Sequence, residues 1–185
     1  MRNLRLFVPL LFFPAGIGLS IHLLQLQLLP DRLLAMALLL FCPELARMAW
    51  VDLENIARVK AQQEDSHLNR FYTIVVGTIV LELLGFYSAL LSLQWGGLII
   101  IFSQLWFNLL ADIQLWPQET PAVVEFGFSK RWPVLIANAV GMALLGFWFI
   151  NGIRIWLAGG LLLLIIAFLL LKYVVPNLSR WRLSA

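Results

Sequence analysis

The residues best suited to chemistry in this sequence are polar side chains within long apolar stretches. Glu82 stands near the middle of the stretch 71–93 and has no charged neighbour within one helical turn. In the following stretch Gln104, Asn108 and Asp112 recur every four residues, so a helix would place them on one face. Ionisable groups at such positions are costly in a bilayer and often mark ion or proton pathways. These residues are therefore the first candidates for a functional site.

The depths of these side chains can be compared because a tight connection at Gln94 joins the two stretches. Counting along the helices places Gln104 and Asn108 about level with Glu82. Asp112 lies nearer the inner surface, and so does Asn138 on a later stretch. The sequence thus predicts one polar cluster that is open toward the cytoplasmic side. Its members are Glu82, Gln104, Asn108, Asp112 and Asn138.

Two interpretations of this cluster remain open. In the functional one, the cluster binds a proton, a cation or the polar end of a small ligand. In the structural one, a protonated Glu82 hydrogen-bonds Gln104 or Asn108 and ties helices together, at about 0.6 to 2 kcal/mol per bond. The substitution Glu82→Gln separates them, because it would abolish activity in the first case and disturb assembly in the second.

Cofactor ligands are scarce in the chain. Its two histidines, His22 and His67, are expected at different depths, so they do not predict a haem held by two histidines. His22 alone could ligate a pigment, or it could form a hydrogen bond between helices. Cys42 is the single cysteine, which excludes an internal disulfide and a CxxC pair. We therefore predict no metal and no cofactor, although lipid or pigment could lie between the helices.

Catalytic motifs are also missing. The chain contains no HExxH, no GxSxG and no P-loop. Two histidines and one cysteine are too few for a zinc site built from the usual ligands. We therefore expect a protein that is not an enzyme.

The composition shows which solvent surrounds these residues. Of the 185 residues, 62% are hydrophobic and only 12% are charged, and the mean hydropathy is +0.89. A soluble domain is about half apolar and about a quarter charged. So little charge cannot cover a water-exposed surface, and the composition predicts an integral membrane protein.

Six apolar stretches are long enough to span the roughly 30 Å hydrocarbon core of a bilayer. They cover 6–29, 33–50, 71–93, 95–116, 132–151 and 155–175. The predicted fold is all-α, with one transmembrane domain over 1–185 that contains three helical hairpins. The segments 51–70 and 117–131 are the predicted cytoplasmic loops. Gly85 and Ala89 are small residues four positions apart, which favours close contact between helices.

The basic residues orient these stretches. With the N-terminus inside, eleven of the 13 lysines and arginines fall on the inner side, and only Arg32 and Arg154 fall outside. Short cytoplasmic loops carry such an excess. Both termini are therefore predicted in the cytoplasm, with the protein in a bacterial inner membrane or a comparable energy-coupling membrane such as the thylakoid.

A surface for contact with partner proteins is predicted on the inner side. Apolar residues recur at helical spacing after the second stretch, which favours an amphipathic helix along the inner surface. This helix could meet a partner or cover the inner ends of the protein's own helices. The predicted contact residues, including two from the second loop, are Leu45, Met48, Leu53, Ile56, Phe126 and Phe128.

Two functions are consistent with these features. The first is an accessory, assembly or scaffold subunit of a larger membrane complex, because the loops are tight and catalytic motifs are missing. The second is a small transporter or substrate-binding membrane component that uses the Glu82 cluster. The expected partners are membrane lipids and other membrane protein subunits. Nucleic acid is not expected, because the basic residues lie at the ends of apolar stretches.

Overall fold

The computed structural model describes residues 2–62, 66–116, 122–125, 127–148 and 154–173. This part of the chain forms six helices and one two-stranded hairpin. In chain order they are α1 (Arg2–Gln25), α2 (Leu29–Lys60), α3 (Ser66–Ala89), α4 (Leu93–Leu110), β1 (Ile113–Trp116), β2 (Ala122–Glu125), α5 (Phe128–Phe147) and α6 (Arg154–Tyr173).

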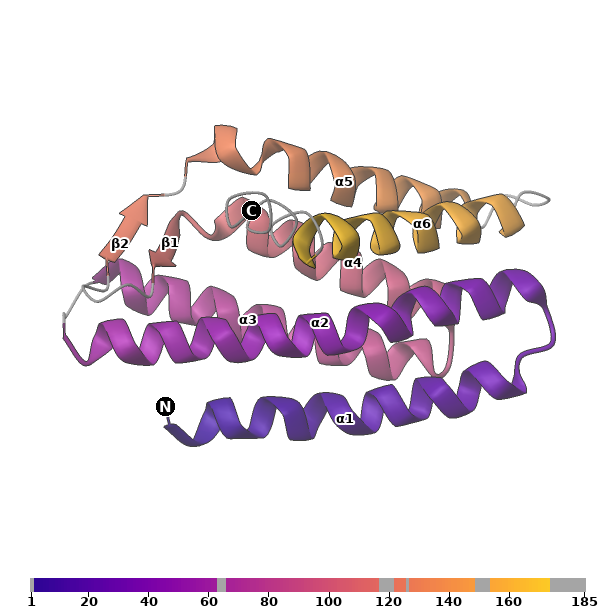
Figure 1. Ribbon diagram of the computed structural model, residues 1–185, viewed down its shortest axis with the longest axis horizontal. Coiled ribbons are helices and arrows are strands. Elements are labelled where there is room, and N and C mark those ends of the chain that lie inside the picture. The colour runs from indigo at the N-terminus through magenta and orange to yellow at the C-terminus, as the bar shows by residue number, and fades with distance from the viewer. Residues whose placement is uncertain (1, 63–65, 117–121, 126, 149–153, 174–185) are drawn as a thin grey trace, which may run out of the picture.

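The helices run side by side and alternate in direction (Figure 1). The helix α2 lies at the centre, where it contacts α1, α3, α4, α6 and β1. The helix α5 packs on α4 and α6 at the edge of the bundle. The hairpin lies at one end of the bundle, and α1 begins and α6 ends toward that end (Figure 1).

Five of the six helices are long and apolar enough to cross a membrane, and α5 is the exception. The first turns of α5 carry Lys130, Arg131 and Pro133, which lower its apolar character. Large apolar side chains cover much of the bundle's exterior, and Leu24, Leu91 and Trp156 are each more than three-quarters exposed. Such a surface suits lipid better than water. The helices therefore indicate a multi-pass membrane protein.

In α2 the predicted second span, 33–50, and the amphipathic inner-surface helix predicted after it form one continuous helix. It runs without a break for 32 residues, about 48 Å, through Pro43 and past Trp50. Its far end buries Leu53 and Ile56 in the same core as the start of α3. The amphipathic pattern after the second stretch thus belongs to one long helix that covers the protein's own core.

The α3–α4 hairpin is held by an unusually close approach of two backbones. A Cβ atom on Gly96 of α4 would lie 2.4 Å from the Cβ of Ala89 on α3, and one on Gly85 would lie 2.5 Å from Ile100. Real Cβ atoms do not come this close, so only glycine fits at these positions. This contact fixes the relative depth of α3 and α4, and therefore of the polar side chains that they carry.

The helix α4 ends at Leu110, before the predicted limit near Trp116. The residues beyond it form β1, which pairs antiparallel with β2 in a register that places Ile113 opposite Glu125. The second predicted cytoplasmic loop, 117–131, therefore contains the strand β2 and the start of α5. Residues 117–121 and Phe126 lie outside the described residues.

Candidate functional site

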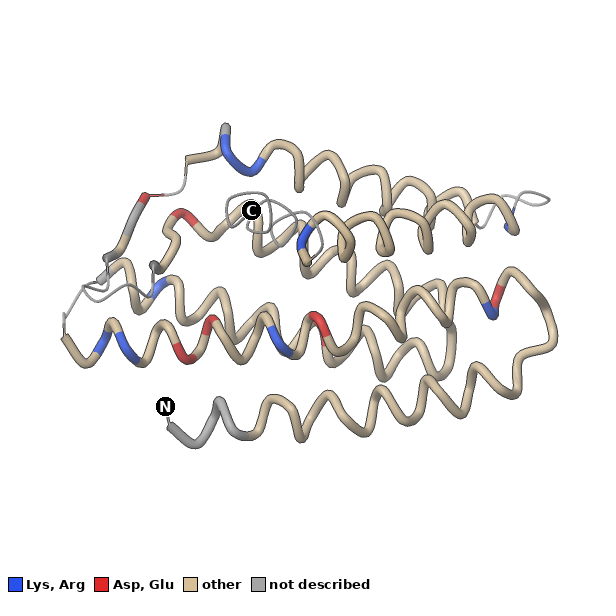
Figure 2. Tube along the Cα trace, viewed as in Figure 1, with Lys and Arg blue, Asp and Glu red and all other residues tan. Residues whose placement is uncertain are grey.

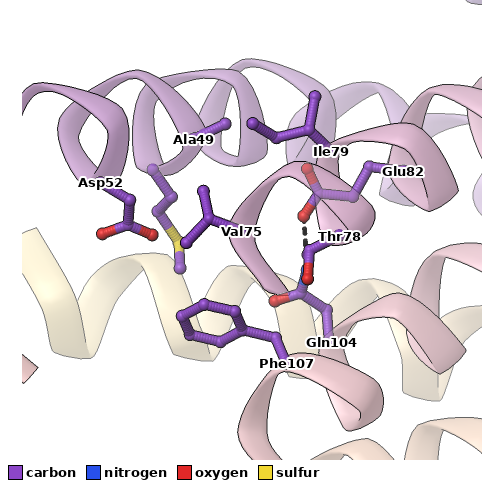
Figure 3. A pocket seen from close by; sticks show the side chains of 9 residues that line it. Ala49, Asp52, Val75, Thr78, Ile79, Glu82, Gln104 and Phe107 are labelled. Atoms are coloured by element: carbon purple, nitrogen blue, oxygen red, sulfur yellow. Dashed lines mark hydrogen bonds between the residues drawn. The ribbon is translucent and has the colours of Figure 1, made fainter. Parts of the chain in front are cut away.

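The centre of the site is the carboxyl group of Glu82, on the face of α3 that meets α4. Its side chain is only 3% exposed. The Nε2 of Gln104 on α4 donates a hydrogen bond of 2.7 Å to its Oε1 (Figure 3). The α3–α4 hairpin thus brings together two of the residues that the sequence singled out.

The second carboxyl oxygen of Glu82 has a different environment. In the part of the chain that the structure describes, Oε2 is buried without a hydrogen-bond partner, and no ion pair involves this residue. A buried ionised carboxylate without a counter-charge costs several kcal/mol, whereas a protonated carboxyl can donate a hydrogen bond. A proton on Oε2 would satisfy this atom if an acceptor lay within reach.

A small cavity beside Glu82 can supply such an acceptor as a water molecule. The cavity has a volume of about 20 Å³ and is lined from α2, α3 and α4, with Asp52, Thr78, Glu82 and Gln104 as its polar residues. A volume of about 10 to 15 Å³ suffices for one water molecule if polar partners are present. The cavity can therefore hold about one water and nothing much larger.

Asp52 is the residue of this site that sequence reasoning missed. It lies on α2 and lines the cavity at the end away from Glu82, with Val75 between the two carboxyl groups in Figure 3. The prediction had placed Asp52 in a loop. The signal that could have found it is its spacing of four residues from Met48, which lines the same cavity once α2 is read as continuous.

The five predicted residues do not form one cluster. Asp112 follows the end of α4, so it leaves the helical face that it was expected to share, and its carboxylate lies 3.4 Å from Arg70. Asn108 stays on α4, but its Nδ2 donates to the backbone oxygen of Gln104 and its own backbone oxygen accepts from Arg131. Neither residue lines the cavity, and neither does Asn138 on α5.

A second buried carboxyl group, Glu44 of α2, has cations beside it. Glu44 is 5% exposed and accepts hydrogen bonds from both Arg47 and Lys172, at 2.9 Å and 2.5 Å to Oε1. The hydroxyl of Tyr173 donates to its Oε2. These bonds connect the last turn of α6 to the middle of α2. The sequence did not predict this contact.

The remaining predicted residues are scattered. His22 lies in the last turn of α1 and His67 in the first turns of α3, at opposite ends of the bundle (Figure 1). Within the described residues no group of three His, Cys, Asp or Glu side chains could hold a metal ion.

The predicted partner contacts are mostly internal. Leu45, Leu53 and Ile56 are buried in the protein's own core, and Met48 lines the cavity. Phe128 is 55% exposed, so it is the one predicted contact residue that the structure clearly places at the surface of the described part.

Comparisons with protein-family models, with curated proteins and with solved structures found no significant match. The chemistry of the site must therefore be argued from its geometry. A carboxyl oxygen without a partner, a space for one water and a second carboxyl group are the parts needed to hold a proton and pass it on.

Proposed function

We propose that this chain is a membrane transport component that binds and releases a proton at Glu82. The observation that supports the proposal is the partnerless Oε2 of Glu82 beside a one-water cavity that Asp52 also lines. Intramembrane carboxyl groups that face a protein interior are typical of proton relays. Gln104 would hold the carboxyl group in place through Oε1 and leave Oε2 to carry the proton.

The size of the site supports a proton rather than a larger solute. A cavity of about 20 Å³ has no room for an organic substrate, since ligand pockets usually measure about 300 to 1,000 Å³. A metal cation would need several ligands, and in the described part of the chain no group of three His, Cys, Asp or Glu side chains could hold one.

The length of α2 supports Asp52 as the exchange point with the inner side. Asp52 follows Arg32 by 20 residues, which is about 30 Å of helix and equals the thickness of the hydrocarbon core. If Arg32 marks the outer boundary, Asp52 lies at the inner one. A proton could then pass from Glu82 through one water to Asp52 and the cytoplasm.

The proposal includes a topology of six spans with both termini in the cytoplasm and α5 as the fifth span. It is supported by the gathering of Lys and Arg positions in the half of the bundle that carries the hairpin (Figure 2). Arg32 lies in the first turn of α2 and Arg154 begins α6, both at the other end. Labelling of cysteines placed at the two ends of α2, from each side of the membrane, tests this topology.

The test of the proton site is infrared difference spectroscopy of the purified protein in lipid during cycles of pH. We expect a carboxylic acid C=O signal that appears and disappears reversibly with pH and is lost in Glu82→Gln. This substitution keeps an oxygen for Gln104, so the bundle should still form. The matched control is Glu54→Gln, because Glu54 pairs with Arg58 on an exposed face. If the carboxylic acid signal of Glu82 does not change with pH, Glu82 has only a structural role as a hydrogen-bonded group, and the proposal is refuted.

A second candidate, an accessory or scaffold subunit of a larger membrane complex, is favoured by one feature of α5. The rings of Phe128 and Trp132 contact each other at a tilt, with 6.0 Å between centroids, and both side chains are 55% exposed. Aromatic pairs of this kind are common in protein interfaces. Stoichiometric copurification with larger subunits that is lost in Phe128→Ala would support this function, and a chain that is always isolated alone would refute it.

A further inference from the structure

A long apolar groove runs between α1 and α2, away from the Glu82 cavity. Its volume is about 530 Å³, and its lining includes Gly16 and Ile17 from α1 and Leu39 and Ala46 from α2. The groove is open at Gly16, where an added Cβ atom would contact only the sulfur of Cys42, at 3.8 Å. The groove lies at the outside of the bundle, between α1 and α2.

One end of the groove differs from the rest, because Arg47 and Trp50 line it there. The Arg47 side chain is 43% exposed although it pairs with Glu44. Lys172 shares the same carboxylate, so the Glu44 anion faces two cations, Arg47 and Lys172. Arginine and tryptophan are also the side chains that favour the boundary between the hydrocarbon core and the headgroups.

The length of the groove matches one leaflet. From Leu39 to Trp50 the lining spans eleven residues of α2, which is about 16 Å of helix. Half of a hydrocarbon core of about 30 Å is about 15 Å. The shape and charge therefore suit a molecule with an apolar chain of one leaflet's depth and a negative group at one end.

We propose that the α1–α2 groove binds one anionic membrane lipid of the inner leaflet. An acyl chain lies along Ile17 and Leu39, and the phosphate group lies beside Arg47. The Trp50 ring packs beside the headgroup, nearer the inner surface than Arg47. The site is independent of the Glu82 cavity, so either proposal can fail while the other stands.

The experiment is native mass spectrometry of the protein in mild detergent, titrated with phosphatidylglycerol or with phosphatidylcholine of the same acyl chains. We expect one tightly retained phosphatidylglycerol and an affinity about tenfold lower for phosphatidylcholine, because the choline cation offsets the negative charge of the phosphate at Arg47. Arg47→Gln should remove this preference. The matched control is Arg58→Gln, an exposed arginine on the same helix that lies outside the groove.

A second variant tests the apolar part of the site. Gly16→Leu fills the groove without touching a charge, and it should weaken the binding of both lipids by about tenfold. A circular dichroism spectrum like that of the native protein shows that each variant is folded, and Ala46→Phe serves as a replacement if Gly16→Leu is not. Equal affinity for the two lipids would overturn the proposal. A retained mass equal to a second protein chain, lost in Gly16→Leu, would overturn it as well, because the occupant would then be a helix.

Discussion

At the scale of single residues, two buried carboxyl groups have opposite surroundings. Glu44 is surrounded by Arg47, Lys172 and Tyr173, whereas Glu82 has the neutral amide of Gln104. A carboxylate with cations beside it is stable as a charged group, while one with an amide alone favours the neutral form. The first group is therefore suited to fastening helices, and the second to gaining and losing a proton.

The substitution Glu44→Gln should destabilise the bundle. It leaves Lys172 beside Arg47 without their shared anion and weakens the attachment of α6 to α2. Breaking a buried pair costs about 3 to 5 kcal/mol, and the partial exposure of Lys172 reduces this to about 1 to 3 kcal/mol. Thermal unfolding in detergent measures the loss. Glu54→Gln is the control and should cost less than about 0.5 kcal/mol, since its partner Arg58 is 58% exposed. Equal losses in the two variants would contradict the role of Glu44.

Part of the site could be predicted from the sequence because it depends on local geometry. Glu82 and Gln104 lie on helices joined by a tight turn, so counting residues gives their depths. Glu44 and Lys172 are separated by 128 residues, and no local pattern indicates that they meet. Asp52 and Asp112 were misplaced for a different reason, which is that the predicted helix limits near them were wrong: α2 continues to Lys60, and α4 ends at Leu110.

At the scale of elements, the α3–α4 crossing is the most demanding contact of the described part. Gly96→Ala should destabilise the protein by about 1 to 3 kcal/mol, because the new methyl group would overlap the backbone of Ala89. The matched control is Gly146→Ala on α5, where a Cβ atom meets nothing within 4 Å. Alanine there should be neutral or stabilising by up to about 1 kcal/mol, because it favours the helix. Unfolding in detergent compares the free energies of unfolding of the two variants. A Gly96→Ala protein as stable as the native one would contradict the prediction, because α3 and α4 could then move apart without a loss of stability.

The two errors in helix length have separate causes. Leu53 and Ile56 follow a helical period, but the period does not say whether the helix turns along the membrane or continues straight. Packing against α3 decides this, and it lies outside the local pattern. For the end of α4 a signal was present. Buried Ile113 and Leu115 alternate with Asp112 and Gln114, which is the period of a strand.

At the scale of the whole molecule, the fold can be predicted from hydropathy to the level of apolar helices in antiparallel hairpins. The number of spans is harder to predict, because α5 begins with Lys130 and Arg131 and carries Asn138 in its middle. A helix of this kind crosses a bilayer more readily when its polar groups face neighbouring helices. Arg131 does so in this protein, since it is 5% exposed and donates a hydrogen bond to the backbone of Asn108.

The orientation of the bundle can be tested along α2 alone. Arg32 and Gln62 are exposed and lie 30 residues apart, which is about 45 Å along the helix and more than the hydrocarbon core. We replace Cys42 by serine and place one cysteine at each position in turn. In sealed cells Arg32→Cys should react with a membrane-impermeant maleimide, and Gln62→Cys should react only after the membrane is opened.

The same pair of variants separates the possible arrangements. Reaction of Gln62→Cys alone in sealed cells would invert the topology. Reaction of both would place α2 on the membrane surface, where its amphipathic half would lie flat and the Glu82 cavity would face water instead of the protein interior. The Cys42→Ser protein without added cysteines contains no thiol, because Cys42 is the single cysteine of the sequence, and it gives the background for both measurements. A proton path from Glu82 to the cytoplasm through Asp52 requires that Arg32→Cys alone reacts in sealed cells, with the outer end of α2 at Arg32.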